Sequence, residues 1–180
     1  MKNSKVLLTL GLALAFAAFT LSLGGSAQAQ TLSYLADFNG TNGFQPFGGV
    51  TQATDGNFYG TTTNGGGHGY GNVYRVTPSG EITSIYDFCK RPNCADGATP
   101  ESVPVLGSDG NLYGTTNGFA YGGYGTVYKM TLSGELTTLY TFCSLADCAD
   151  GSLPNALMQA SDGNFYGTTN RGGNSNAGTI

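Results

Sequence analysis

The chain has 180 residues, of which 30 are glycine, 11 tyrosine and 10 phenylalanine, and only 10% are charged. Its formal net charge is −4, and such an acidic surface repels phosphate backbones, so we expect no nucleic-acid partner. A high glycine content is also typical of disorder, but disordered chains lack this many aromatic residues. We therefore expect tight turns that join short aromatic strands.

The first 29 residues have the features of a secretory signal peptide. Lys2 and Lys5 give a positive start, residues 6–23 are largely apolar, and the small-x-small sequence AQA ends at Ala29. Cleavage there would leave residues 30–180, with five basic residues against eleven acidic ones, in a protein that is secreted or held at the cell surface. The alternative is a retained membrane anchor. No later segment is apolar enough to span a bilayer.

The chain then repeats itself. The octapeptide DGNFYGTT occurs at residues 55–62 and 162–169 and, as DGNLYGTT, at residues 109–116. Residues 71–89 also match residues 125–143, at an offset of 54. A period of this length is typical of propeller blades and similar arrays.

One period contains four predicted strands, at residues 102–108, 111–116, 126–131 and 135–142, which we call strands a to d. Strands b, c and d are rich in aromatic and β-branched residues. Each Asp-Gly pair of the octapeptide predicts a hairpin turn between strands a and b, because both central positions of a type I′ turn need a positive φ. The three aspartates are therefore interpreted as structural. The expected fold is all-β, with tandem four-stranded antiparallel blades that form a fragment of a β-propeller.

The copies are unequal in extent. Two complete blades span residues 43–88 and 97–142, and a partial blade spans residues 151–180. Residues 31–38 (TLSYLADF) match strand d with no other strand before them. Closed propellers normally need four or more blades, so we expect a truncated gene product. The alternative is one part of an assembly that self-associates through open blade edges.

These residues resemble the GloVer tandem repeat family of exported bacterial proteins. The resemblance rests on DGN[FL]YGTT, on residues 125–142 (GTVYKMTLSGELTTLYTF), and on the ADG-x-x-P segments at residues 95–100 and 149–154. It implies an exported, surface-associated repeat protein with a propeller-like fold, and it implies no established activity or functional residue. The chain departs from the family's pattern in its copy number and its cysteines.

The four cysteines form two Cys-x4-Cys pairs one period apart, Cys89 with Cys94 and Cys143 with Cys148. Each pair lies between strand d of one blade and strand a of the next. In an exported protein this spacing predicts a disulfide within each pair, which would stabilise the fold by roughly 2 kcal/mol. The alternative is a four-cysteine zinc site, although the usual Cys-x2-Cys spacing is absent.

No residue pattern points to catalysis, a metal or a cofactor. His68 is the only histidine, so an HExxH metal site is excluded. The segment around it resembles a calcium-binding nonapeptide, but Gly71 stands where the ligand aspartate should be. The sequence contains neither Gly-x-Ser-x-Gly nor a phosphate-binding glycine motif. We therefore predict no catalytic, cofactor-binding or metal-ligating residue.

A ligand is expected where the repeats diverge. In an up-and-down blade the b–c and d–a loops share one end, which here carries the glycine-rich and cysteine loops. The third copy has Arg171 and Asn174 there, and the first two copies carry the candidate ligand-binding residues His68, Tyr70, Phe119, Tyr121 and Tyr124.

Conserved strands with one divergent set of loops favour a binding or scaffold module for an extracellular glycan or a cell-surface partner. Two alternatives remain open. The tyrosines could only pack over the blade ends, or the chain could be a fragment of a secreted glycan-active hydrolase or lyase whose site other blades complete.

Overall fold

The computed structural model describes residues 32–118 and 122–180, within which residues 34–180 form one compact unit. The predicted signal peptide at residues 1–29 lies outside the described residues. The described chain is all-β, with short 3₁₀ turns and no α-helix. No helical segment in this part of the chain has the length and apolar character needed to cross a membrane.

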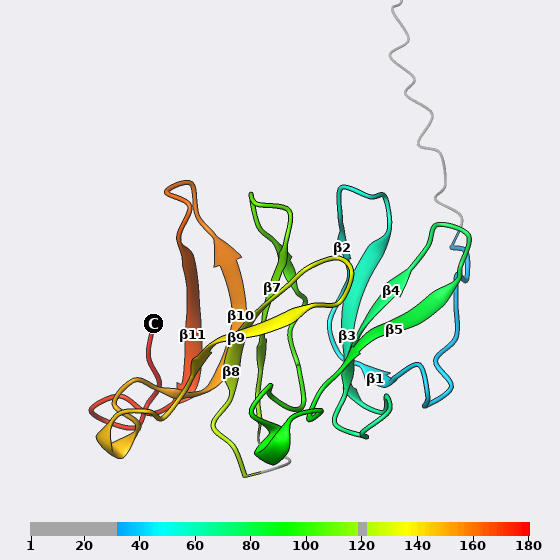
Figure 1. Cartoon of the computed structure of the whole chain (residues 1–180). Coiled ribbons are helices and arrows are strands. Elements are labelled where there is room, and N and C mark those ends of the chain that lie inside the picture. Colours follow the sequence, from blue (N-terminus) through cyan, green and yellow to red (C-terminus); the bar gives the residue numbers. More distant parts are fainter. Residues whose placement is uncertain (1–31, 119–121) are drawn as a thin grey trace, which may run out of the picture. The chain divides into compact units, whose positions relative to one another are not determined.

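Three antiparallel sheets follow one another along the chain (Figure 1). The first contains β1 (Phe44–Pro46), β2 (Thr51–Gln52), β3 (Phe58–Asn64), β4 (Asn72–Val76) and β5 (Ile82–Asp87). The second contains β6 (Val105–Leu106), β7 (Leu112–Thr116), β8 (Thr126–Met130) and β9 (Leu136–Thr141). The third is the hairpin of β10 (Ser152–Gln159) and β11 (Phe165–Arg171). The predicted all-β fold with tandem antiparallel blades of the propeller type is confirmed.

Strand a differs from the prediction in each sheet. In the first sheet it is split into β1 and β2, which both pair with β3. In the second sheet only β6 remains of the strand predicted at residues 102–108, because Pro104 has no N–H to donate to a ladder. In the third sheet β10 runs through both parts, with a register shift between Pro154 and Leu157.

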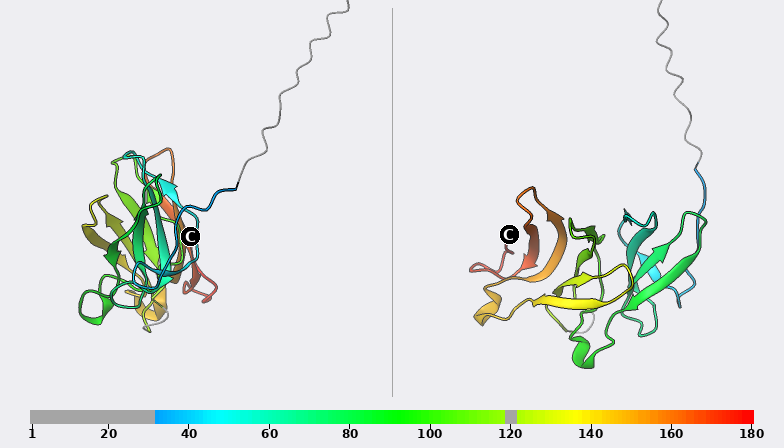
Figure 2. Two further views of the ribbon diagram at one scale, coloured as in Figure 1. Left: turned by 90° about the vertical axis from the view of Figure 1, so that its right-hand side faces the viewer. Right: turned by 45° about the horizontal axis from the view of Figure 1, so that its top comes forward.

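The described part of the predicted leading strand, residues 32–38, forms no strand, which corrects the prediction for residues 31–38. Residues 34–38 of this segment nevertheless lie beside the β4–β5 hairpin (Figures 1 and 2). The backbone carbonyl of Leu35 packs against Gly80, as the carbonyl of Ile85 in β5 packs against Gly134 one repeat later. The segment thus occupies a strand-d position, and none of the described residues pairs with it in a ladder.

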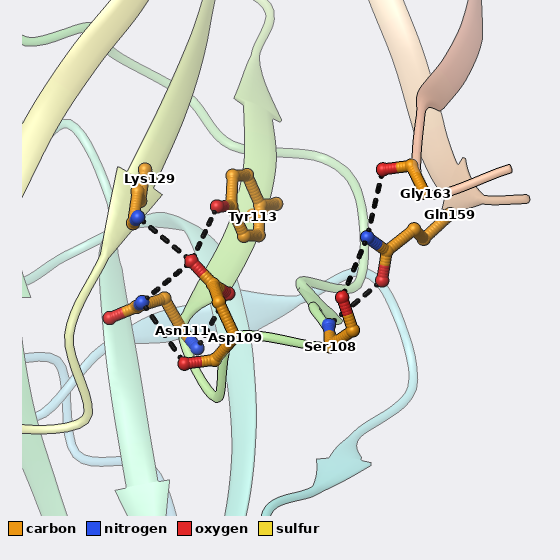
Figure 3. A network of polar contacts seen from close by, with 7 residues as sticks. All are labelled: Ser108, Asp109, Asn111, Tyr113, Lys129, Gln159 and Gly163. Carbon is orange, nitrogen blue, oxygen red and sulfur yellow. Dashed lines mark hydrogen bonds and ion pairs between the residues drawn. The ribbon is translucent and has the colours of Figure 1, made fainter.

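The first half of the octapeptide is a hydrogen-bonded turn. In the second copy the Asp109 carboxylate accepts bonds from the Asn111 backbone N–H (3.2 Å), the Asn111 amide (2.8 Å) and the Tyr113 hydroxyl (2.9 Å) (Figure 3). It also pairs with Lys129 Nζ at 2.8 Å. Gly110 has a φ of 77°, but Asp109 has no positive φ, so the turn is not the predicted type I′. The Gly110 N–H instead bonds the Gly107 carbonyl (2.9 Å), which places Ser108 and Asp109 at the centre of the turn and Gly110 after it. The other two copies repeat the bonds to Asn and Tyr.

The second half of the octapeptide packs and links the sheets. A Cβ on Gly60 or Gly114 would overlap the ring of the tyrosine opposite on strand c, Tyr74 or Tyr128. The first threonine of the Thr-Thr pair donates to the next sheet, since Thr115 Oγ1 bonds the carbonyl of Asn155 at 2.7 Å. The equivalent bond of the first copy runs from Thr61 Oγ1 to Ser102 O (2.9 Å). The second threonine bonds strand c in the first two copies and Thr179, which lies in no strand, in the third. The fourth position contributes to the core in the second copy, where Leu112 is fully buried. In that copy all eight positions of the repeated motif therefore have a structural role, as predicted for its aspartate.

The ADG-x-x-P segments also join consecutive sheets. Backbone N–H groups of Thr99 and Leu153 donate to the carbonyls of Tyr70 and Tyr124 of the preceding sheet, each at 2.8 Å. Next to these bonds, Pro100 packs on Gly71 and Pro154 packs on Gly125. Side chains add to this contact at the opposite end of the sheets, where Gln159 accepts a bond from the Ser108 N–H at 2.8 Å (Figure 3).

The turn aspartates predict a loss of stability in acid. Hydrogen bonds from Lys129 and then Asn111 hold the pKa of Asp109 well below its ordinary value of 3.8. A carboxyl with a lowered folded pKa stabilises the fold above its unfolded pKa, and this contribution is lost as pH falls below about 4. We expect urea midpoints measured from pH 5 to pH 2 to fall less steeply for Asp109→Asn than for the wild type. Equal slopes would contradict the prediction.

Candidate ligand-binding site

The cysteine and glycine loops lie together at one end of the blades, opposite the Asp-Gly turns (Figure 1). Each cysteine loop connects strand d to the next sheet through a 3₁₀ turn, η1 (Pro92–Cys94) or η3 (Ala146–Cys148). The predicted disulfides, Cys89–Cys94 and Cys143–Cys148, are both present. Since all four sulfurs are paired with one another, they do not form the alternative zinc site. Two disulfides are consistent with an extracellular protein.

An aspartate organises each cysteine loop from within. The Asp96 carboxylate accepts bonds from the Tyr86 hydroxyl (2.7 Å) and from the N–H groups of Lys90 (2.9 Å) and Arg91 (3.1 Å). Asp150 makes the equivalent bonds to Tyr140, Ser144 and Leu145 in the next loop. Both aspartates were expected in loops, but this role was not predicted. The signal was available, because each copy has a tyrosine three residues before its first cysteine and an aspartate two residues after its second.

The hydrogen bonds to Asp150 change its ionisation. Burial raises the pKa of this carboxyl, but the bonds from Tyr140, Ser144 and Leu145 outweigh that effect and hold the pKa well below its ordinary value. In the first loop burial, together with the bond to Asp96, raises the pKa of Tyr86. The Asp150 carboxylate is therefore ionised at neutral pH. In both loops, donors of the loop itself already occupy the carboxylate oxygens.

Two cavities open between these loops. The first, which we call the neutral cavity, has a volume of about 370 Å³ and lies between the first cysteine loop and the second glycine loop. None of the described residues that line it is charged. Its polar lining comes from Asn93, Thr116, Tyr124, Thr126 and Thr141. The hydroxyls of Thr116 and Thr126 already bond each other at 2.8 Å.

The second, which we call the arginine cavity, has a volume of about 310 Å³. It lies between the second cysteine loop and the third glycine loop, one repeat along the chain from the neutral cavity. Its lining includes Tyr124, Cys148, Ser152, Leu153, Arg171 and Asn176. Gly122, Gly123 and Tyr124 line both cavities. The Tyr124 side chain, 51% exposed, is therefore an aromatic wall shared by two neighbouring cavities.

The structure brings one of the predicted ligand residues to these cavities. Tyr124 lines both. His68 is exposed and Tyr70 is half-buried in the first glycine loop, and neither lines either cavity. Phe119 and Tyr121 lie outside the described residues. Arg171 was noted in the sequence only as a point of divergence, whereas Ser152 and Asn176 gave no sequence signal.

The sheets and loops define an all-β tandem-repeat module of the propeller type. The sequence matches the Gloeobacter/Verrucomicrobia repeat over residues 17–180, and the chain belongs to this family, as the sequence predicted. No curated protein matches it.

Two solved structures are similar to the chain. One is the selenomethionine-substituted virginiamycin B lyase from Staphylococcus aureus, with 24% identity and a TM-score of 0.46 over 66% of this chain and 33% of that one. The other is a candidate gluconolactonase, with 20% identity and a TM-score of 0.46 over 67% of this chain and 40% of that one. The chain thus spans well under half the length of either protein.

Proposed function

We propose that this repeat module binds an extracellular glycan at the loop end of its blades, with Tyr124 as the central contact. The observation that carries the proposal is the half-exposed Tyr124 ring between two cavities lined by hydroxyl, amide and backbone groups. Sugars present apolar C–H faces and a rim of hydroxyls. An aromatic ring flanked by donors and acceptors suits both features.

Two further features support an extracellular role. The two disulfides need an oxidising compartment to persist, and the first 29 residues carry the pattern of an export signal. The loops also differ between repeats while the strands agree, which is the arrangement expected of a scaffold that presents a variable binding surface.

The proposal predicts that Tyr124→Ala abolishes or strongly weakens glycan binding without unfolding the protein. The purified protein would first be screened on a glycan array, and the strongest hit would then be measured by calorimetry. We expect affinity to fall about tenfold or more for Tyr124→Ala, because loss of a stacked ring removes roughly 1–3 kcal/mol. Tyr124→Phe should retain most of the affinity.

Tyr34 supplies the control, since it is more exposed than Tyr124 (76% against 51%) and lines neither cavity. Tyr34→Ala should bind as the wild type does. Full affinity in a folded Tyr124→Ala variant would contradict the proposal, and so would an array on which no glycan binds.

A further inference from the structure

Three residues of the arginine cavity depart from the repeat, and all three departures add hydrogen-bond donors. When the repeats are aligned on their octapeptides, Arg171 occupies the position of Gly118, and Asn176 occupies that of Gly123. Counted from the cysteines, Ser152 occupies the position of Ala98. The neutral cavity, one repeat earlier, thus has glycine or alanine where the arginine cavity has a guanidinium, an amide and a hydroxyl.

The strand register brings two of these residues together. Ser152 and Arg171 are cross-strand partners of the β10–β11 ladder, and directly paired residues of an antiparallel ladder project on the same face. Asn176 is held in the same loop as Arg171, because its Oδ1 accepts a bond from the Gly172 N–H at 2.9 Å. That bond leaves the amide NH₂ of Asn176 as a donor.

These donors are available to a ligand. The one ion pair among residues 32–118 and 122–180 joins Lys129 to Asp109, so Arg171 has no carboxylate partner in this part of the chain. Asp150, in the adjoining cysteine loop, is already occupied by its own loop. The exposed Asp147 of η3 does not pair with Arg171 either. Within the described residues the Ser152 hydroxyl has no hydrogen-bond partner, although the residue is only 5% exposed.

A cavity that presents hydrogen-bond donors and one cation favours a ligand that has hydrogen-bond acceptors and one negative charge. The planar guanidinium fork matches a carboxylate in two parallel hydrogen bonds. The chain carries more acidic than basic residues, so densely charged anions would be repelled overall. A sugar carboxylate meets both conditions, since it places a single charge beside hydroxyls and a ring that can stack on Tyr124.

On the basis of the proposed glycan binding, we propose that the arginine cavity binds the carboxylate of a uronic-acid residue. The neighbouring sugar of the same chain then occupies the neutral cavity on the other side of Tyr124. The ligand is therefore an acidic polysaccharide, and the two cavities are consecutive subsites.

The test compares an oligosaccharide in which one uronic acid is linked to neutral sugars with the same oligosaccharide after methyl esterification, which removes the charge and keeps the sugar. Calorimetry should show the acid form binding the wild type about tenfold or more tightly than the ester, the effect of a charge-assisted hydrogen bond. Arg171→Gln should bring the acid form down to the affinity of the ester and leave the ester unchanged. Arg171 is exposed and packs into no core, so this variant should fold.

The matched control is Lys90→Gln, which removes an exposed cation from the first cysteine loop, outside both cavities. It should leave the preference for the acid form intact.

Equal affinity for acid and ester would overturn the uronate inference while leaving glycan binding in place. The uronate inference would also be overturned if Lys90→Gln abolished the preference for the acid form as fully as Arg171→Gln does. The same holds if dextran sulfate bound more tightly than the acid form and this binding depended on Arg171. Binding of neither form by a protein that binds other glycans would also overturn it, whereas a protein that binds no glycan at all fails the proposed function itself.

Discussion

Replacement of Gly125 by alanine is expected to lower the free energy of unfolding by about 2–5 kcal/mol. Gly125 has a φ of 95°, and a side chain in this left-handed region costs roughly 1–2 kcal/mol. A Cβ there would also overlap Pro154 of the next sheet and approach the carbonyl of Thr116, and overpacking of this kind costs about 1–3 kcal/mol. The contact joins two sheets, so the damage is not confined to one turn.

Gly110→Ala separates the two effects. Gly110 has a φ of 77°, but a Cβ there meets nothing within 4 Å. Only the conformational cost of roughly 1–2 kcal/mol should remain. Urea unfolding of both variants, followed by circular dichroism, measures the difference. Equal losses in the two variants would show that the packing of Pro154 on Gly125 contributes nothing to stability.

The second large effect is expected for Asp96→Ala, which should destabilise the fold by about 3–5 kcal/mol. The carboxylate is fully buried, and its removal leaves the Tyr86 hydroxyl and the N–H groups of Lys90 and Arg91 without an acceptor. Each buried donor left unpaired costs roughly 1–3 kcal/mol. The disulfide would still close the loop, but it cannot replace the lost acceptor.

Asp150→Ala is the matched comparison, because Asp150 makes the same three kinds of bond in the second cysteine loop. Asp150 is half-buried and its partners are exposed, so water can replace the carboxylate more readily than in the first loop and the loss should be smaller. Thermal unfolding of the two variants under oxidising conditions provides the measurement. A larger loss for Asp150→Ala would refute the argument from burial.

The contrast between these aspartates shows what repetition alone does not reveal. Both lie in the sequence Cys-Ala-Asp-Gly, yet Asp96 is fully buried and Asp150 is only half-buried. The first cysteine loop is covered by the following sheet, where the Arg91 guanidinium donates to the carbonyl of Leu136 in β9 (3.3 Å) and Thr138 donates to the carbonyl of Ala95 (3.3 Å). No described strand covers the second loop in this way.

The candidate site was predicted only in outline. Blade topology placed the divergent loops at one end, and Tyr124 was among the residues named from the sequence. The cavities themselves depend on gaps between loops of different repeats, and no pattern within one repeat encodes such a gap. The importance of Arg171 depends on its register partner Ser152 and on the lack of a carboxylate partner among the described residues, both of which are tertiary facts.

The sequence by itself determined the features that depend on neighbours along the chain. The 54-residue period, the Asp-Gly hairpins, strands b to d and both disulfides follow from turn chemistry and short loop closures, which act over a few residues. Only the tertiary structure decided what happens where repeats meet. Residues 32–38 match strand d in sequence but form no strand, strand a is split or shortened, and Pro154 packs on Gly125. A strand exists only when another chain segment accepts its hydrogen bonds, and burial exists only when another blade covers the surface.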